Sequence, residues 1–197
     1  MKRIMIALAV MFLFNGTTRM TNPMVTRALL TALQNERAAE ARYEAFAARA
    51  TEEGYLGVAA LFHAEARAER VHASRFEKFL ASRGINAPVP NPPQPTVGST
   101  SDNLRSALNA EKQERDDSYL AAFNEAQSAG DAEAAKLFDT TRDAETEHLN
   151  LDNDASRNLS KMKESKSYYV CPDCGYTTEV KLPFCPSCRG KEMEKFD

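Results

Sequence analysis

The chain has 197 residues, which is enough for one ordinary domain and one very small one. Its composition is that of a globular protein, with 43% hydrophobic and 27% charged residues, and its net charge of −3 gives no reason to expect nucleic acid or an anionic membrane as a partner. The sequence contains no Gly-rich phosphate loop and no dinucleotide fingerprint, which argues against a nicotinamide cofactor held by this chain.

The first twenty residues resemble a targeting segment more than part of a fold. Lys2 and Arg3 precede the apolar run Ile4–Phe14, as in a secretory signal, but the run is too short for a membrane span, which needs about 20 residues. No clear cleavage motif follows, and Met20 provides a conventional start just before the first helical pattern. We therefore expect residues 1–20 to be either a signal-like segment or an extension outside the working protein.

Two long helices are predicted next. Asn22 and Pro23 combine a capping side chain with proline at the first helical position, and the periodic pattern that follows runs to about residue 53. Gly54 interrupts this pattern, and a second one covers about residues 55–83. In both segments the inward positions recur every three or four residues, which is typical of helices in a bundle.

The connection to the third helix is long and rich in proline. Residues 85–98 contain five prolines, which predicts an extended crossover of the kind found in ferritin-like bundles. Ser101 or Asp102 is expected to cap the third helix, and Leu108 and Ser118 are expected among its inward positions.

The fourth helix is predicted to follow the turn at Gly130 and to run into the 150s. The polar segment 150–166 is expected to fray into a linker. The fold class is therefore mainly α. We expect a ferritin-like four-helix bundle over residues 21–164 and a small C-terminal module over residues 165–197.

Seven side chains of metal-ligand type fall on the inward stripes of these four helices. They are Glu36, Glu69, His72, Glu111, Glu114, Glu145 and His148. A spacing of three places both members of each Glu-x-x-His or Glu-x-x-Glu pair on one helix face. One such pair alone would be weak evidence, because most lie on solvated surfaces. Ionised groups on all four inward stripes cost several kcal/mol each unless metal ions neutralise them, so the set predicts a dinuclear metal site.

Other side chains near this stripe have a less certain role. His63 lies nine residues before His72, on the opposite face of the helix, and is interpreted as structural or surface. Glu65 lies one turn before Glu69, and Glu40 lies one turn after Glu36. Either could be a carboxylate on the ligand face that does not bind a metal ion. Tyr43 and Tyr119 could be ordinary core residues or could orient a ligating carboxylate by a hydrogen bond.

The four cysteines form a second metal motif. Cys171, Cys174, Cys185 and Cys188 make two CxxC turns separated by ten residues, which strongly predicts a tetrahedral site with four thiolate ligands. The module is too small to fold on a hydrophobic core alone, so its metal would also stabilise it. Zinc and iron both accept this geometry, and iron is favoured because the module is fused to a redox-capable bundle.

These motifs resemble those of the rubrerythrin family over about residues 25–197. The segment Asn35–Tyr43 resembles the first-helix motif of the family, and Glu69–Ala73 resembles its second. Glu111–Glu114 resembles the third motif and Glu145–His148 the fourth. The cysteine module resembles the short rubredoxin-like domain of the family. One departure is Arg189, which follows the second cysteine turn where the family often has glycine.

The resemblance implies a non-haem di-iron centre with defined ligand roles. In these roles Glu69 and Glu145 bridge two irons, Glu36 and Glu114 hold one of them, Glu111 and His148 hold the other, and one iron exchanges Glu114 for His72 when its redox state changes. Tyr43 and Tyr119 match the tyrosines that surround the ligands. The resemblance also implies a homodimer in which the cysteine iron of one subunit lies close to the di-iron site of the other.

The function implied is that of a peroxidase in oxidative-stress defence. Hydrogen peroxide would be reduced to water, with electrons relayed through the four-cysteine iron from an external donor protein of rubredoxin or reductase type. The alternatives are a ferroxidase or iron-handling bundle with a structural zinc ribbon, and a non-enzymatic bundle that binds a protein partner. The family is usually cytoplasmic, and a periplasmic location is the alternative if residues 1–20 act as an export signal.

Overall fold

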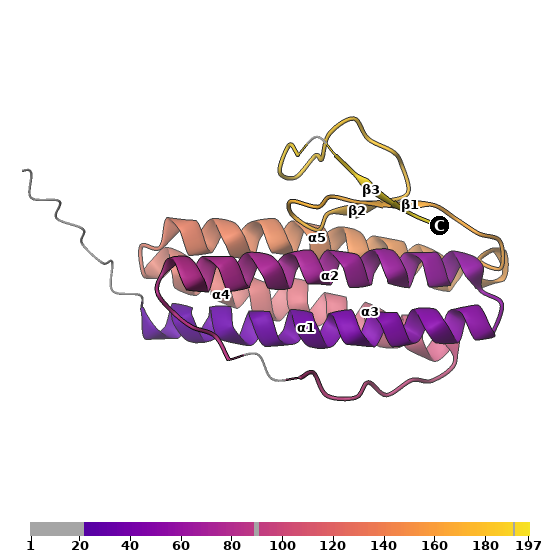
Figure 1. Cartoon of the computed structure of the whole chain (residues 1–197), viewed down its shortest axis with the longest axis horizontal. Helices are drawn as coiled ribbons and strands as arrows, with labels where there is room; N and C mark the ends of the chain where they lie inside the picture. Colours follow the sequence, from indigo (N-terminus) through magenta and orange to yellow (C-terminus); the bar gives the residue numbers. More distant parts are fainter. Residues whose placement is uncertain (1–21, 89–90, 191) are drawn as a thin grey trace, which may run out of the picture.

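The protein is a long helical bundle with a small module packed along one side (Figure 1). The structure, a computed structural model, describes residues 22–88, 91–190 and 192–197. The segment 1–20, expected to be signal-like or an extension, lies outside the described residues. Among the helices that are described, none is both long and apolar enough to cross a membrane.

The first two helices form an antiparallel pair, α1 (Pro23–Glu52) and α2 (Leu56–Ser82), as the sequence predicts. The Asn22 side chain accepts a hydrogen bond of 2.8 Å from the backbone N–H of Met24, which caps α1 ahead of its first proline. Gly54 lies between the helices with a φ of 76°, in the left-handed region that glycine adopts without steric cost.

The proline-rich connection crosses the length of the bundle and makes α3 (Thr100–Gln113) run parallel to α2 (Figure 1). The predicted cap at Ser101 or Asp102 is wrong, because Ser99 caps this helix. Its backbone is extended and its hydroxyl accepts a hydrogen bond from the N–H of Asp102 at 3.2 Å. The carboxylate of Glu53 accepts a second bond, of 2.9 Å, from the N–H of Thr100.

The third helix of the bundle contains a π-turn, η1 (Glu114–Ser118), before it continues as α4 (Tyr119–Ser128). A π-turn adds one residue to the local repeat, so the next inward position after Glu114 falls five residues later instead of four. Tyr119 is therefore buried, while the predicted inward residue Ser118 is exposed. Leu108 is only half-buried, and Ala107 takes the core position in its place.

The fourth helix, α5 (Ala132–Arg157), is followed by a short 3₁₀ helix, η2 (Leu159–Lys161). The predicted fraying over residues 150–166 is therefore wrong for much of that segment, because it contributes to the core. Asp152 and Ala155 are buried, and Met162 is fully buried against the bundle. The carbonyl of Met162 also accepts a hydrogen bond of 2.9 Å from the N–H of Gly57.

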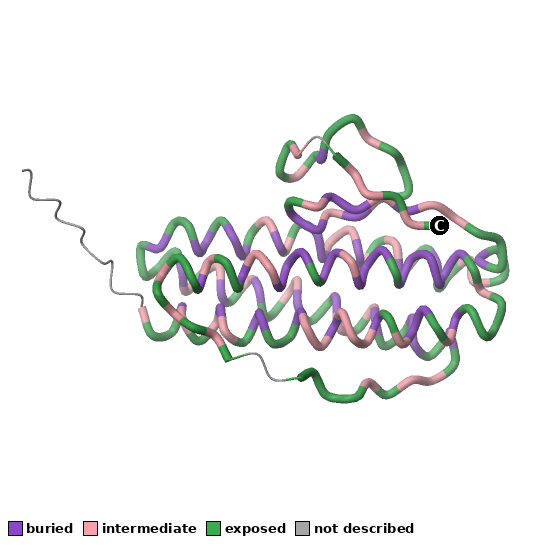
Figure 2. Tube along the Cα trace, viewed as in Figure 1, coloured by how far each residue is buried: buried purple, intermediate pink, exposed green. Residues whose placement is uncertain are grey.

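Buried residues recur along the inward side of all the helices (Figure 2). The apolar ones form two clusters, one toward each end of the bundle, and the ligand-type residues lie between them along the helices. Representative members of the two clusters are Phe46, Phe62 and Leu104 at one end, and Leu29, Phe76 and Phe138 at the other. This apolar packing stabilises the helices on both sides of the buried ligand-type residues, and it does not depend on their charges.

The C-terminal module contains a three-stranded antiparallel sheet in the order β2-β1-β3, from β1 (Tyr168–Val170), β2 (Thr177–Thr178) and β3 (Glu194–Phe196). It lies over α2 and α5 (Figure 1). Arg67 of α2 donates two hydrogen bonds, of 2.7 and 2.9 Å, to the Glu194 carboxylate of β3. This bidentate pair fixes the module against the bundle.

Candidate metal centres

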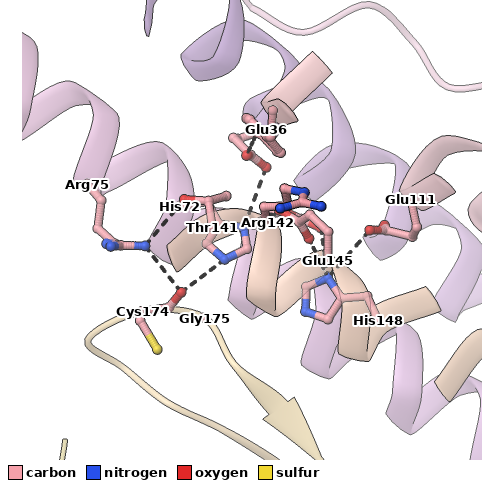
Figure 3. Close-up of polar contacts among 12 residues, drawn as sticks. Glu36, His72, Arg75, Glu111, Thr141, Arg142, Glu145, His148, Cys174 and Gly175 are labelled. Atoms are coloured by element: carbon pink, nitrogen blue, oxygen red, sulfur yellow. Dashed lines mark hydrogen bonds and ion pairs between the residues drawn. The ribbon is translucent and has the colours of Figure 1, made fainter. Parts of the chain in front are cut away.

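All seven predicted ligands are buried in the middle of the bundle. The ligand atoms of six of them form two groups, in each of which all atoms lie within 4.8 Å of one another. The first group is Glu36, Glu69, His72 and Glu145, and the second is Glu69, Glu111, Glu145 and His148. Glu69 and Glu145 belong to both groups, which is what two neighbouring ions with shared carboxylates require. Figure 3 shows Glu145 between the two histidines.

Glu114 is the one predicted ligand outside both groups. It is buried in the π-turn, and burial and the nearby charge of Glu111 raise its pKa well above the ordinary value. The resemblance implied that Glu114 and His72 exchange as ligands of one iron. In this structure His72 is the residue grouped with Glu36, and the exchange itself remains a prediction.

The two histidine rings are oriented by residues of the cysteine module. Nε2 of His72 lies 3.0 Å from the backbone carbonyl oxygen of Cys174, which can only accept a hydrogen bond (Figure 3). Nε2 therefore carries a proton, and in the neutral ring the lone pair of Nδ1 faces Glu69 at 2.9 Å and Glu145 at 3.1 Å. A lone pair directed at carboxylate oxygens needs a cation or a proton between them.

The ring of His148 is oriented in the same way, by a hydrogen bond at Nε2. Its Nε2 lies 3.1 Å from the hydroxyl oxygen of Thr177, and that hydroxyl already donates its proton to the carbonyl of Gly175 at 3.0 Å. Thr177 must therefore accept from Nε2, so that in the neutral ring the lone pair lies on Nδ1 of His148, 2.9 Å from Glu145. Both rings thus present Nδ1 to the carboxylate band.

The carboxylates fit metal ions because so many of their oxygens lack a donor. Buried oxygens without a hydrogen-bond partner in the structure belong to Glu36, Glu69, Glu111, Glu114 and Glu145. Burial and the charge of Glu69 raise the pKa of Glu36 well above its ordinary value. Burial alone would lower the pKa of His72, but the charges of Glu145 and Glu36 hold it well above its ordinary value. Two cations bound by oxygen and imidazole would relieve this repulsion, and iron accepts that donor set.

The two tyrosines orient ligands and are not simply core residues. The Tyr43 hydroxyl donates a hydrogen bond to Glu111, and the Tyr119 hydroxyl donates one to Glu36. Both rings are buried among apolar side chains. Each tyrosine therefore holds one carboxylate in a fixed rotamer beside the site.

The structure distinguishes the roles of His63, Glu40 and Glu65. His63 is exposed and pairs with Glu44 at 3.1 Å, which confirms its interpretation as a surface residue. Glu40 pairs with Arg70 at 2.7 Å and belongs to neither ligand group. Glu65 also belongs to neither group, but it is fully buried, so it is not a solvated residue.

The cysteine sulfurs converge as the motif predicts. All four thiols are free and lie within 4.8 Å of one another, and the pairs Cys171–Cys188 and Cys174–Cys185 are 3.5 Å apart. A disulfide would require about 2.05 Å. Tetrahedral coordination at a metal–sulfur distance of 2.3 Å places sulfurs roughly 3.8 Å apart, so the cluster fits one metal ion.

The two cysteine turns share one backbone geometry. Gly175 donates its N–H to the carbonyl of Cys171 at 2.9 Å, and Arg189 donates its N–H to that of Cys185 at 3.0 Å. Both residues are left-handed, with φ of 84° and 68°. The departure from glycine at Arg189 therefore costs about 1–2 kcal/mol of backbone strain, and its guanidinium lies 5.1 Å above the Phe184 ring.

The Cys174 carbonyl connects the two metal sites within one chain. It accepts from His72 and lies 3.5 Å from the Arg75 guanidinium, which also donates to Thr140 at 2.6 Å. The resemblance implied that this approach occurs between subunits, whereas here the module lies against its own bundle. Sequence reasoning missed Arg75 and Thr177, because no local pattern indicates which helix a distant module will contact.

Gly175 is required by this contact as well as by its own backbone. A Cβ there would lie 2.2 Å from Nε2 of His72, whereas a Cβ at Gly84, which has a similar φ of 73°, would meet nothing within 4 Å. Gly175→Ala is expected to lower the free energy of unfolding by about 2–5 kcal/mol, against about 1–2 for Gly84→Ala, because only the former adds a clash to the strain. Denaturant titration of both variants measures this difference, and equal losses would contradict the docked position of the module.

Comparison with known proteins places the chain in one family. The rubrerythrin family model matches residues 27–154. The nigerythrin of Nitratidesulfovibrio vulgaris is 32% identical over 161 residues, covering 81% of this chain and 79% of the relative. The rubrerythrin of Porphyromonas gingivalis is 34% identical over 166 residues, covering 81% and 82%. A solved nigerythrin structure in the fully reduced, all-ferrous state has a TM-score of 0.79 at 27% identity, covering 98% of this chain and 100% of that one. The chain belongs to the rubrerythrin family.

Proposed function

We propose that this protein is a non-haem di-iron peroxidase that reduces hydrogen peroxide to water in oxidative-stress defence. Two irons would occupy the bundle, and a third iron in the four-cysteine site would relay electrons from an external donor protein of rubredoxin or reductase type. A homodimer in the cytoplasm is part of the same proposal. The family named by the comparisons is one of oxidoreductases, which supports the general class.

The observation that carries the proposal is the direct link between the two metal sites. His72 belongs to the first bundle group through Nδ1, and its Nε2 hydrogen-bonds the carbonyl of a cysteine ligand candidate, Cys174. A purely structural zinc ribbon would need no such contact with a redox centre. The arrangement instead gives electrons a short covalent and hydrogen-bonded route from the cysteine site into the bundle.

The residues of the chain prepare the site for this chemistry. Bound iron would supply the electrons and the Lewis acidity that split the O–O bond. Tyr43 and Tyr119 keep Glu111 and Glu36 in fixed orientations, and full burial keeps bulk water out. A cavity of about 220 Å³ between α1 and the third helix is lined by Arg42 and Glu114, among others, and would be the approach of a small oxidant in this proposal.

A peroxide titration of the reduced, iron-loaded protein tests this function. We expect each molecule of hydrogen peroxide to oxidise the bundle irons by two electrons within seconds. The absorption of the ferric cysteine site should then appear as that iron passes its electron to the bundle, and it should bleach again as the donor reduces it. Dioxygen serves as the comparison oxidant. Bundle irons that stay ferrous with peroxide, or react no faster with it than with dioxygen, would overturn the assignment of peroxide as the substrate.

The alternative is iron oxidation with a structural cysteine site. It is favoured by one observation, because a tetrahedral cluster of four thiols accepts zinc as well as iron. Zinc in the module and iron mineral accumulating beyond the bound pair would support it. In that case the protein would oxidise ferrous iron without an external donor protein.

A further inference from the structure

Two carboxylates outside both metal groups lie one helical turn beyond them. Glu65 precedes Glu69 by four residues on α2, and Asp152 follows His148 by four residues on α5, so each shares a helix face with a ligand. Both side chains are 0% exposed. Neither oxygen of either carboxylate has a hydrogen-bond partner among the described residues.

The ionisable groups that act on this pair come from each element packed around it. They are Arg42 and Tyr43 of α1, Glu69 of α2, Glu111 of α3, His148 of α5 and Tyr168 of β1. Burial and the charge of Asp152 raise the pKa of Glu65 well above its ordinary value. Burial and the charge of Glu111 do the same for Asp152, and they outweigh the opposing charges of His148 and Arg42.

Two buried acids without donors cannot both be ionised at an acceptable cost. An isolated buried carboxylate carries a desolvation penalty of several kcal/mol, and a second negative charge nearby adds to it. Protons or a cation must therefore neutralise Glu65 and Asp152. Among the described residues, ligand-type groups of three or more occur only at the two bundle sets and the cysteines, so the geometry favours protons over a third metal ion here.

We propose that Glu65 and Asp152 are a proton store for the His148 side of the metal centre. Both are protonated at rest, and one proton at a time is released toward the oxygen that leaves as water. Only one of the two carboxyl groups ionises at a time, because a pair that carries two negative charges is too costly. This inference rests on the proposed peroxidase function for its substrate, while the protonation of the pair stands on burial and missing donors alone.

The stoichiometry of the reaction gives the store its purpose. Reduction of one peroxide to two waters takes up two electrons and two protons, and breaks the O–O bond. The electrons come from the bundle irons of the proposed function. One proton leaves the carboxyl O–H of Glu65 or Asp152 and becomes an O–H of water. The second proton comes from solvent water, which also reprotonates the carboxylate before the next turnover. A buried site without such a store would have to admit water for each proton.

Infrared difference spectra of the iron-loaded chain test the protonation directly. We expect a carbonyl band of a neutral carboxylic acid that shifts in D₂O and changes between the reduced and the peroxide-oxidised protein. Glu65→Gln and Asp152→Asn should each remove part of this band while retaining the bundle irons. Asp154→Asn is the matched control, because Asp154 is on the same helix, is exposed, and should leave the band intact.

Rapid-mixing kinetics provide the second readout. We expect each of the two variants to slow single-turnover oxidation by peroxide at least about tenfold, with the double variant no slower than the worse single one, because general-acid groups contribute about 10²–10⁴-fold. The wild-type rate should fall as pH rises through the pKa of the pair, since the proton is then absent, and the variants should lose that dependence.

The outcomes separate this inference from the proposed function. A wild-type protein that shows the band but does not react with peroxide would contradict the proposed function. Glu65 and Asp152 would then be protonated, but they would have no reaction to supply with protons. Fast peroxide reduction with no band, or with a band and pH profile unchanged in both variants, would overturn the store alone. Binding of a third iron per bundle that both variants abolish would overturn it in favour of a metal site.

Discussion

Replacing Glu145 by alanine is expected to remove both metal ions from the bundle and to leave the helices folded. Glu145 is the residue whose two oxygens both lack a hydrogen-bond donor and which belongs to both ligand groups. Its loss would withdraw one shared ligand and a single negative charge from the two ions together. Altered neighbours of ligands typically cost 10–100-fold in metal affinity, so loss of a shared ligand is expected to cost more than about 100-fold. Iron analysis after desalting measures it.

Glu147→Gln provides the control for this experiment. Glu147 lies two residues further along α5, is only half-buried and belongs to neither group. The control should retain both irons. A Glu145→Ala protein that still holds two irons after desalting would contradict the shared role of this carboxylate, whereas the apolar clusters at the two ends should preserve the helical signal in either case.

Cys171→Ser is expected to abolish donor-linked turnover while preserving one oxidation of the bundle. A serine hydroxyl does not replace a thiolate ligand, so the cysteine site should lose its metal and its electron relay. Hydrogen bonds within the cluster, first of all from Cys174, lower the pKa of the Cys171 thiol, which favours the thiolate form that binds a metal ion. Steady-state assays with a protein donor and single-turnover mixing with peroxide measure the two activities.

A small chemical reductant supplies the control for Cys171→Ser. It should restore slow turnover in the variant, because it can reduce the bundle irons without the cysteine relay. Turnover of the variant with the protein donor at the wild-type rate would contradict electron transfer through the cysteine site and would indicate that the cysteine module is structural. Loss of the single oxidation as well would indicate that the variant damages the bundle through the contact between Cys174 and His72.

Much of the bundle could be predicted because its signals are local. The three-four periodicity fixed the extents of α1 and α2 to within one or two residues, and it placed the ligands on inward stripes that the structure confirms as buried. The proline-rich segment 85–98 indicated a crossover for the same reason. Tyr43 could be assigned only in part, since periodicity gives its face but not the carboxylate it contacts.

The remaining features depend on long-range contacts or small shifts in register. The π-turn at Glu114–Ser118 replaces Ser118 by Tyr119 at the inward position, and no local residue preference marks such a turn. Thr177 reaches His148 only because the module folds back over α5. Asp152 stands four residues after His148, so its face was predictable, but its burial depends on helix packing and on the chain near Met162.

The most direct test of the account is the iron and zinc content per chain of protein purified without air. The account predicts about three irons and no zinc, from two in the bundle groups and one in the four-cysteine site. About two irons and one zinc would preserve the bundle chemistry but remove the relay. Zinc alone, with no iron in the bundle even after reconstitution, would contradict the central claim that the buried carboxylates and histidines hold a di-iron centre.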